Sequence, residues 1–142
     1  MSNTMRISMR RLSGAHFEAR NDAGQSCVID GPAEIGGTGQ GMRPMELVLV
    51  ALAGCSAVDV LHIMSKQRQL LHHLDIEVTG ERADAVPAVY THIHVVFTGS
   101  GDIELDKLER AVALSFAKYC SVARMLEPKV KITYEAKRAG AP

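Results

Sequence analysis

Two cysteines in separate helix-like segments are the residues of this sequence best suited to chemistry. Cys55 lies within residues 43–64, and Cys120 lies within residues 108–126. Small and apolar residues surround both, and packing of this kind needs no thiol. If the fold brings the thiols together, one could react with an oxidant and the other could resolve it as a disulfide. Free cysteine is also a common buried hydrophobe, so simple packing is the alternative.

The two cysteines differ in their local surroundings. Asp59 lies one helical turn after Cys55 and opposes ionisation of its thiol. Cys120 lies between Lys118 and Arg124, at an expected break between two helices where a helix N-terminus would lower its pKa. We therefore expect the pKa of Cys120 to be lowered. Ionisation of the Cys55 thiol would need a cation from elsewhere in the fold.

Composition and charge indicate an ordinary soluble domain. The 142 residues are expected to form one domain, 1–142. Sixteen basic and sixteen acidic residues cancel, which argues against nucleic acid as a partner. The apolar stretch 47–58 is too short to span a bilayer, and residues 1–11 lack the apolar core of a signal peptide. We expect a cytoplasmic protein without a membrane partner, in which three cysteines form no disulfide framework.

Other motifs for catalysis or metal binding are weak. His92 and His94 alternate along one strand face, but no cysteine or carboxylate lies at a matching spacing, so half-exposed side chains are favoured over zinc. The glycine-rich residues 36–41 lack the lysine of a phosphate-binding loop, and no serine lies in a nucleophile-elbow motif. We expect neither a metal nor a cofactor.

The elements expected around the cysteines indicate an α+β fold. Alternating apolar and polar residues predict strands at 5–12, 16–20, 26–30, 74–82, 90–97 and 129–136. Residues 31–43 form a glycine-rich loop, and glycines 99 and 101 are expected to end the strand before them. Apolar spacing predicts helices from 44 into 65–69, at 105–120 and at 121–126.

The helix that begins at Pro44 is apolar on every side. Proline suits a first helical turn, and apolar residues then occupy all faces until polar residues begin at 65–69. Asp59 and His62 are the polar exceptions. Such a helix must be buried, either in a core or at an interface between copies of the chain.

Three stretches together carry a family resemblance. They are residues 43–61 with the first cysteine, the strand pair within 78–97, and residues 108–126 with the second cysteine before a final strand. In this order they cover nearly the whole chain. The sequence resembles the OsmC-like proteins, which include osmotically inducible protein C and the organic hydroperoxide resistance proteins.

The resemblance implies a fold, an assembly and an activity. The fold would have antiparallel sheets packed around a long central helix that carries Cys55, in an intertwined homodimer. The activity would be reduction of small organic hydroperoxides. The residue matching Cys55 would attack the peroxide and become a sulfenic acid, and the residue matching Cys120 would close a disulfide. A dithiol, such as a lipoyl group, would reduce that disulfide.

The start of the cysteine helix departs from the peroxidase pattern. Peroxidase members carry Pro-Glu there, and the glutamate orients an activating arginine. In this chain Met45 follows Pro44 and Glu46 comes one residue later, a shift of roughly 100° around a helix. Arg43 and Glu46 are our candidates for the activating pair, and Arg6, Arg10 and Arg11 are alternative sources of the cation. The alternative function is a non-catalytic module that binds a small apolar ligand or senses redox state.

Overall fold

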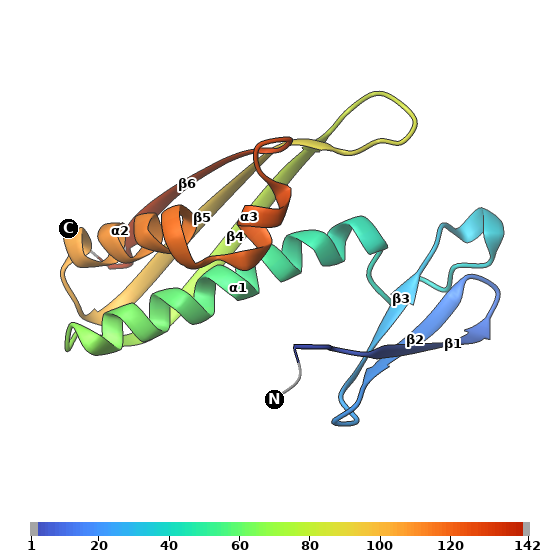
Figure 1. Cartoon of the computed structure of the whole chain (residues 1–142), viewed down its shortest axis with the longest axis horizontal. Coiled ribbons are helices and arrows are strands. Elements are labelled where there is room, and N and C mark those ends of the chain that lie inside the picture. The colour runs from blue at the N-terminus through green and yellow to red at the C-terminus, as the bar shows by residue number, and fades with distance from the viewer. Residues whose placement is uncertain (1–2, 141–142) are drawn as a thin grey trace. The chain divides into compact units, whose positions relative to one another are not determined.

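Two three-stranded sheets and three α-helices form the part of the chain that this computed structural model describes, residues 3–140 (Figure 1). The chain divides into two units, Met1–Val48 and Leu49–Pro142. The first contains β1 (Ile7–Ser13), β2 (His16–Asn21), β3 (Ser26–Asp30) and the 3₁₀ turn η1 (Ala33–Ile35). Helix α1 (Pro44–Lys66) continues into the second, which adds β4 (Leu70–Arg82), β5 (Tyr90–Asp102), α2 (Leu105–Leu114), the π-helical turn η2 (Ser115–Tyr119), α3 (Ser121–Leu126) and β6 (Lys131–Arg138). The expected α+β class is confirmed, and the single domain over 1–142 stays a prediction.

The first unit is an antiparallel meander with a returning loop. Strand β2 pairs with β1 on one side and with β3 on the other. Gly24, in the turn between β2 and β3, has a φ of 88°, which a residue without a side chain adopts without strain. After β3 the loop comes back alongside the sheet, where the Asp30 amide donates to the Met42 carbonyl at 3.0 Å.

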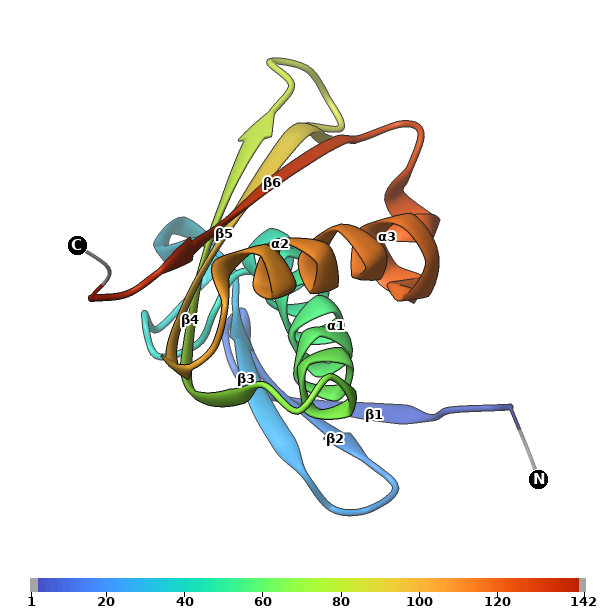
Figure 2. The same ribbon diagram turned by 90° about the vertical axis from the view of Figure 1, so that its left-hand side faces the viewer.

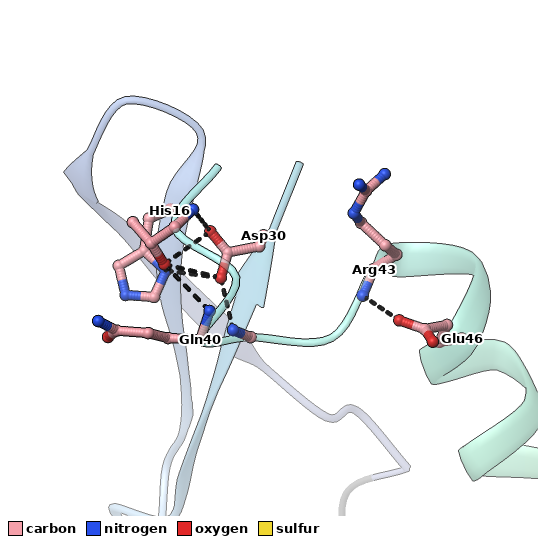
Figure 3. Close-up of polar contacts among 7 residues, drawn as sticks. His16, Asp30, Gln40, Arg43 and Glu46 are labelled. Carbon is pink, nitrogen blue, oxygen red and sulfur yellow. Dashed lines mark hydrogen bonds and ion pairs between the residues drawn. The ribbon is translucent and has the colours of Figure 1, made fainter. Parts of the chain in front are cut away.

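A buried carboxylate fastens this loop to the strands (Figure 3). Asp30 is 1% exposed and accepts hydrogen bonds from the Thr38 amide, the Thr38 hydroxyl and the Gly41 amide. On the neighbouring strand, His16 Nδ1 lies 3.1 Å from Asp30 Oδ2. Chiefly through the Thr38 amide, these contacts lower the Asp30 pKa from 3.8 to about 2, although burial acts in the opposite direction. The fold therefore stabilises the ionised form of the Asp30 carboxyl group.

The second unit packs its helices on one face of a mixed sheet (Figure 2). Strand β5 lies between antiparallel β4 and parallel β6. Along β5, Ile93, Val95 and Phe97 are fully buried, whereas His92 and the other alternate residues are only partly covered. The helices complete this core with Leu52, Val60, Met64, Leu108, Ala111 and Val112. Burying one such large side chain contributes about 1.5–3 kcal/mol.

Strand β5 is longer than the glycines in its sequence suggest. We expected Gly99 and Gly101 to end it, but the strand continues to Asp102. A Cβ on Gly99 would lie 2.9 Å from Leu71 and 3.1 Å from Leu108, so this glycine makes room for packed side chains. Gly101 has a φ of 130° and pairs with Leu71 beside an irregularity in the register.

Helix α1 is buried along one side only. Leu52, Ser56, Val60 and Met64 recur at four-residue steps and are fully buried or nearly so. On the other side Val58 is 67% exposed. Helix α1 has 23 residues, and an 18-residue window of it has a mean hydropathy of 2.1, so it is long and apolar enough to cross a membrane by length and composition, which the shorter stretch 47–58 did not indicate. The core helices of soluble proteins pass the same test.

Asp30→Asn should make stability depend on pH in a defined window. The folded-state pKa of about 2 lies below the ordinary 3.8, so the carboxylate stabilises the fold above pH 3.8 and loses this effect as the pH falls toward about 2. The urea midpoint of the variant should lie below that of the wild type at neutral pH and approach it in this acid range. The matched control is Asp22→Asn, because Asp22 is exposed in its pair with Arg6. Equal midpoints at neutral pH would contradict the anchoring role of Asp30.

Candidate functional site

Two sulfurs and a carboxylate oxygen meet where α1 faces the end of η2. The Cys55 Sγ, the Cys120 Sγ and a carboxylate oxygen of Asp59 all lie within 4.8 Å of one another. Cys55 and Asp59 are half-buried and Cys120 is 3% exposed. The second unit therefore brings together two thiols that are far apart in sequence. Their chemical role stays a prediction at this point.

A π-helical turn sets the position of Cys120. Helix α2 ends at Leu114, and the wider turn η2 follows, in which the Cys120 amide donates to the Ser115 carbonyl at 2.7 Å. Cys120 itself is extended, with φ −74° and ψ 105°, and is the N-cap of α3. The expected break between two helices is therefore present. Single π-helical turns change which residues face a neighbouring helix, and they occur frequently at functional sites.

Two buried hydroxyls support the carboxylate. The Ser115 hydroxyl donates to Asp59 Oδ2 at 2.9 Å and lies 3.0 Å from the Ser56 hydroxyl. Both serines are fully buried. Each hydroxyl has one proton, so a chain from Ser56 to Ser115 to Asp59 would satisfy both donors. The Asp59 side chain is thereby fixed beside the sulfurs.

The pKa of Cys120 is raised, contrary to our expectation. Burial is the largest cause and raises it from 9.0 to about 11. The Ala123 amide donates to the sulfur at 3.4 Å and lowers the pKa, whereas Cys55 raises it further. The flanking cations are directed elsewhere: the Lys118 Nζ lies 5.3 Å from the centre of the Tyr119 ring, and Arg124 donates to the Ala117 carbonyl. The thiol form is therefore favoured.

Arg43 and Glu46 lie in the first unit, at the start of α1. The Glu46 carboxylate accepts a hydrogen bond from the Arg43 amide at 2.8 Å, as the third residue of a helix often does. The Arg43 guanidinium points away from Glu46 (Figure 3). Glu46 thus caps its own helix, and the activating role of this pair stays a prediction. The third cysteine, Cys27, is exposed on β3 and is not a packing residue.

A cavity of about 350 Å³ borders the carboxylate. Its lining comes from the second half of α1 and from the segment before Cys120: Asp59, His62, Ile63, Lys66, Gln67, Leu114 and Tyr119. The Gln67 Oε1 is buried and has no hydrogen-bond partner within residues 3–140. The cavity therefore combines apolar walls with polar groups of both charges.

His92 and His94 take part in a hydrogen-bond network on a partly exposed sheet face. One nitrogen of each ring lies within 2.8 Å of the Thr133 hydroxyl. The other nitrogens lie 3.2 Å from Glu81 and 3.6 Å from Glu135. Neighbouring strands supply these carboxylates, so spacing along one strand could not reveal them. The side chains of His92 and His94 are 35% and 39% exposed, which agrees with the expectation that they are half-exposed.

Sequence reasoning missed three members of the site. Ser56 and Ser115 were not considered, and Asp59 was treated only as a charge that opposes ionisation. One signal was available, because Cys55 and Asp59 are four residues apart on a predicted helix and must share a face. Nothing in the local sequence marks Ser115 as a partner for Asp59.

Comparisons with known proteins agree on one family. The family described as OsmC-like protein matches residues 37–135. The chain is 37% identical to Protein YhfA of Escherichia coli (strain K12) over 131 residues, 92% of this chain and 95% of that protein. A hypothetical protein from Aquifex aeolicus VF5 has a crystal structure with a TM-score of 0.82 at 34% identity, covering 96% of this chain and 98% of the other. The organic hydroperoxide resistance protein OhrB of Bacillus subtilis shares the fold, with a TM-score of 0.65 at 19% identity over 94% of this chain and 98% of the other.

Cys55→Ala should lower the pKa of Cys120. The hydrogen bond that the Cys120 thiol makes to Cys55 and the charge of Cys55 both raise that pKa, so removing the Cys55 sulfur should bring it down from about 11, while burial keeps it above 9.0. In a Cys27→Ser background, thiolate absorbance during a pH titration follows Cys55 and Cys120 together, and in Cys27→Ser/Cys55→Ala it follows Cys120 alone. Val58→Ala on the exposed side of α1 is the control and should change nothing. An unchanged Cys120 pKa in Cys55→Ala would show that the sulfurs do not interact.

Proposed function

The chain belongs to the OsmC-like protein family, and on that premise we propose that it is a thiol-dependent reductase of small organic hydroperoxides that uses Cys55 and Cys120. One observation carries the proposal: the two sulfurs lie within 4.8 Å of each other. The family includes proteins of organic hydroperoxide resistance, which supports a role in redox defence. A dithiol resting state requires a reducing compartment, so we place the protein in the cytoplasm.

The reaction proceeds in two covalent steps. The Cys55 thiolate attacks the terminal oxygen of the hydroperoxide, the O–O bond breaks, and the alkoxide takes up a proton and leaves as an alcohol. Cys55 is then a sulfenic acid. The Cys120 sulfur attacks the Cys55 sulfur, and the hydroxide leaves as water while the disulfide forms. An external dithiol then supplies two electrons and two protons and restores both thiols.

In this proposal Asp59 acts as a base in the second step. Cys120 has a pKa of about 11, so it carries its proton when the sulfenic acid forms. A carboxylate oxygen of Asp59 lies within 4.8 Å of that sulfur, and Ser115 holds the carboxylate in place. Transfer of the thiol proton toward Asp59 would produce the attacking thiolate only when the sulfenic acid is present.

Activation of Cys55 requires a cation, and Arg43 remains our candidate. The Asp59 carboxylate within 4.8 Å of the Cys55 sulfur makes a nearby positive charge more necessary. Arg43 stands at the start of α1, 12 residues before Cys55 and so roughly 18 Å away along the helix, and we propose that the guanidinium reaches the thiol of a second copy of the chain. Because Glu46 caps α1, it would orient Arg43 through the backbone.

We also propose that the protein is a homodimer that buries the exposed side of α1. Val50, Val58 and Leu61 lie along this side and are 50%, 67% and 50% exposed. Gly54 lies between them, and a Cβ placed on it would meet nothing within 4 Å in its own chain. A second copy of α1 could therefore approach closely at Gly54, and its apolar side chains would cover the stripe.

The cavity beside Asp59 favours a second candidate, a module that binds a small apolar ligand or senses redox state. Ile63, Leu114 and Tyr119 would contact an apolar ligand, and the unpartnered Gln67 Oε1 would accept a hydrogen bond from it. In this alternative the thiols would bind or sense but not turn over. The two candidates differ in whether hydroperoxide is consumed catalytically.

Cysteine variants test the reductase. Cys55→Ser should abolish consumption of an alkyl hydroperoxide in the presence of a dithiol, because the attacking sulfur is gone. Cys120→Ser should reduce one equivalent and stop at a sulfenic acid that a cyclic dione traps, as mass spectrometry would show. The matched control is Cys27→Ser, which should keep wild-type turnover. Wild-type protein that consumes no hydroperoxide would exclude the reductase and leave the binding module.

Substitutions on α1 test the dimer. Val58→Asp should weaken it about 100-fold or more, because an unpaired buried carboxylate costs several kcal/mol and about 1.4 kcal/mol is a factor of ten. Gly54→Leu should also weaken it, although the new side chain meets nothing in its own chain. Light scattering gives the molar mass. Val86→Asp, at a fully exposed position, is the control. A monomeric wild type at micromolar concentration would refute this assembly.

A further inference from the structure

We propose that Cys55, Cys120 and Asp59 form a Zn²⁺ site in the reduced protein. Their three ligand atoms lie within 4.8 Å of one another, and they come from two elements packed together. In a tetrahedral zinc site with two sulfurs and one oxygen, ligand atoms are about 3.3–3.8 Å apart. Small side-chain rotations bring the three atoms to that spacing. Metal binding itself does not depend on the function proposed above.

The donor set favours zinc over the hard divalent cations. Two thiolates and one carboxylate suit Zn²⁺, whereas Mg²⁺ and Ca²⁺ prefer oxygen ligands alone. Three protein ligands leave a fourth position for water. Cys55 and Asp59 are half-buried, and the cavity of about 350 Å³ borders Asp59, which gives an ion a path to the site.

Hydrogen bonds around the three residues match those of a metal site. Ser115 donates to Asp59 Oδ2 at 2.9 Å, which leaves the other carboxylate oxygen for a metal. The Ala123 amide donates to the Cys120 sulfur at 3.4 Å, which would stabilise a thiolate. Contacts of this kind orient metal ligands and fix their charge. Without a cation, three negative charges so close together would repel one another, and a bound Zn²⁺ reverses this effect.

Zinc binding and disulfide formation exclude each other. Binding one Zn²⁺ releases two thiol protons and moves no electrons. A disulfide joins the two sulfurs and removes both thiolates, so oxidation must release the metal. If the reductase proposed above is correct, bound zinc inhibits it until the metal is removed. This regulatory consequence rests on the proposed function.

Metal binding to the full chain tests the site directly. The protein is reduced with a phosphine, freed of metal and titrated with Zn²⁺ against a chromophoric chelator, with Cys27→Ser as the common background. Co²⁺ in place of zinc should give sulfur-to-cobalt charge-transfer absorption and tetrahedral ligand-field bands. Cys55→Ser and Cys120→Ser should each remove the tight binding, and Asp59→Asn, which removes a charged ligand, should weaken it by at least the roughly 10–100-fold that loss of an outer-shell partner costs. Asp75→Asn, an exposed carboxylate on β4, is the control and should bind normally.

Each outcome bears on the proposal. Affinity that survives in the Cys55→Ser/Cys120→Ser double variant would overturn the site, and unchanged affinity in Asp59→Asn would remove Asp59 as a ligand. Hydroperoxide consumption is measured separately on the metal-free protein. Zinc binding without consumption leaves the metal site standing and rejects the reductase. Hydroperoxide consumption without zinc binding would reject the metal site and leave the reductase standing.

Discussion

The hydrogen bond between Ser115 and Asp59 holds the site together. A half-buried carboxylate beside two sulfurs needs a donor, and Ser115 supplies it at 2.9 Å, with the Ser56 hydroxyl 3.0 Å beyond. Ser115 also begins the π-helical turn that leads to Cys120, and its carbonyl accepts the Cys120 amide. One residue therefore bonds to α1 through its side chain and to Cys120 through its backbone. The positions of the carboxylate and the second sulfur are coupled through it.

The three groups of the site all become anions when they lose a proton, so charge on one opposes charge on the others. Burial acts in the same direction on Cys120, and the amide donors at the start of α3 are too few to reverse it. In the stable resting state Cys120 is protonated, because its pKa is raised to about 11. Reactivity at Cys120 therefore has to be created by what arrives at the site, whether an oxidised sulfur on Cys55 or a cation.

The sequence predicted local features well and tertiary ones poorly. Each expected strand and helix is present, because alternation and helical spacing are local signals, although β5 extends five residues further and α2 ends at Leu114 where the π-helical turn begins. Gly99 was misread as a strand end, since only the packed fold shows that Leu108 needs the space. The pKa of Cys120 was predicted with the wrong sign. Lys118 and Arg124 flank it in sequence, but in the fold they are directed toward other groups, and burial decides the outcome.

The separation of the sulfurs explains why one site can support two kinds of chemistry. A disulfide needs sulfurs about 2.05 Å apart, and a shared zinc ion needs them about 3.8 Å apart. The structure limits the separation to 4.8 Å or less, so small rearrangements reach either state. Asp59 would have a task in both proposals, as a base for the Cys120 proton or as a ligand for the metal. A carboxylate held by Ser115 could serve either purpose after a small side-chain rotation, and the oxidant or metal present in solution would then select between them.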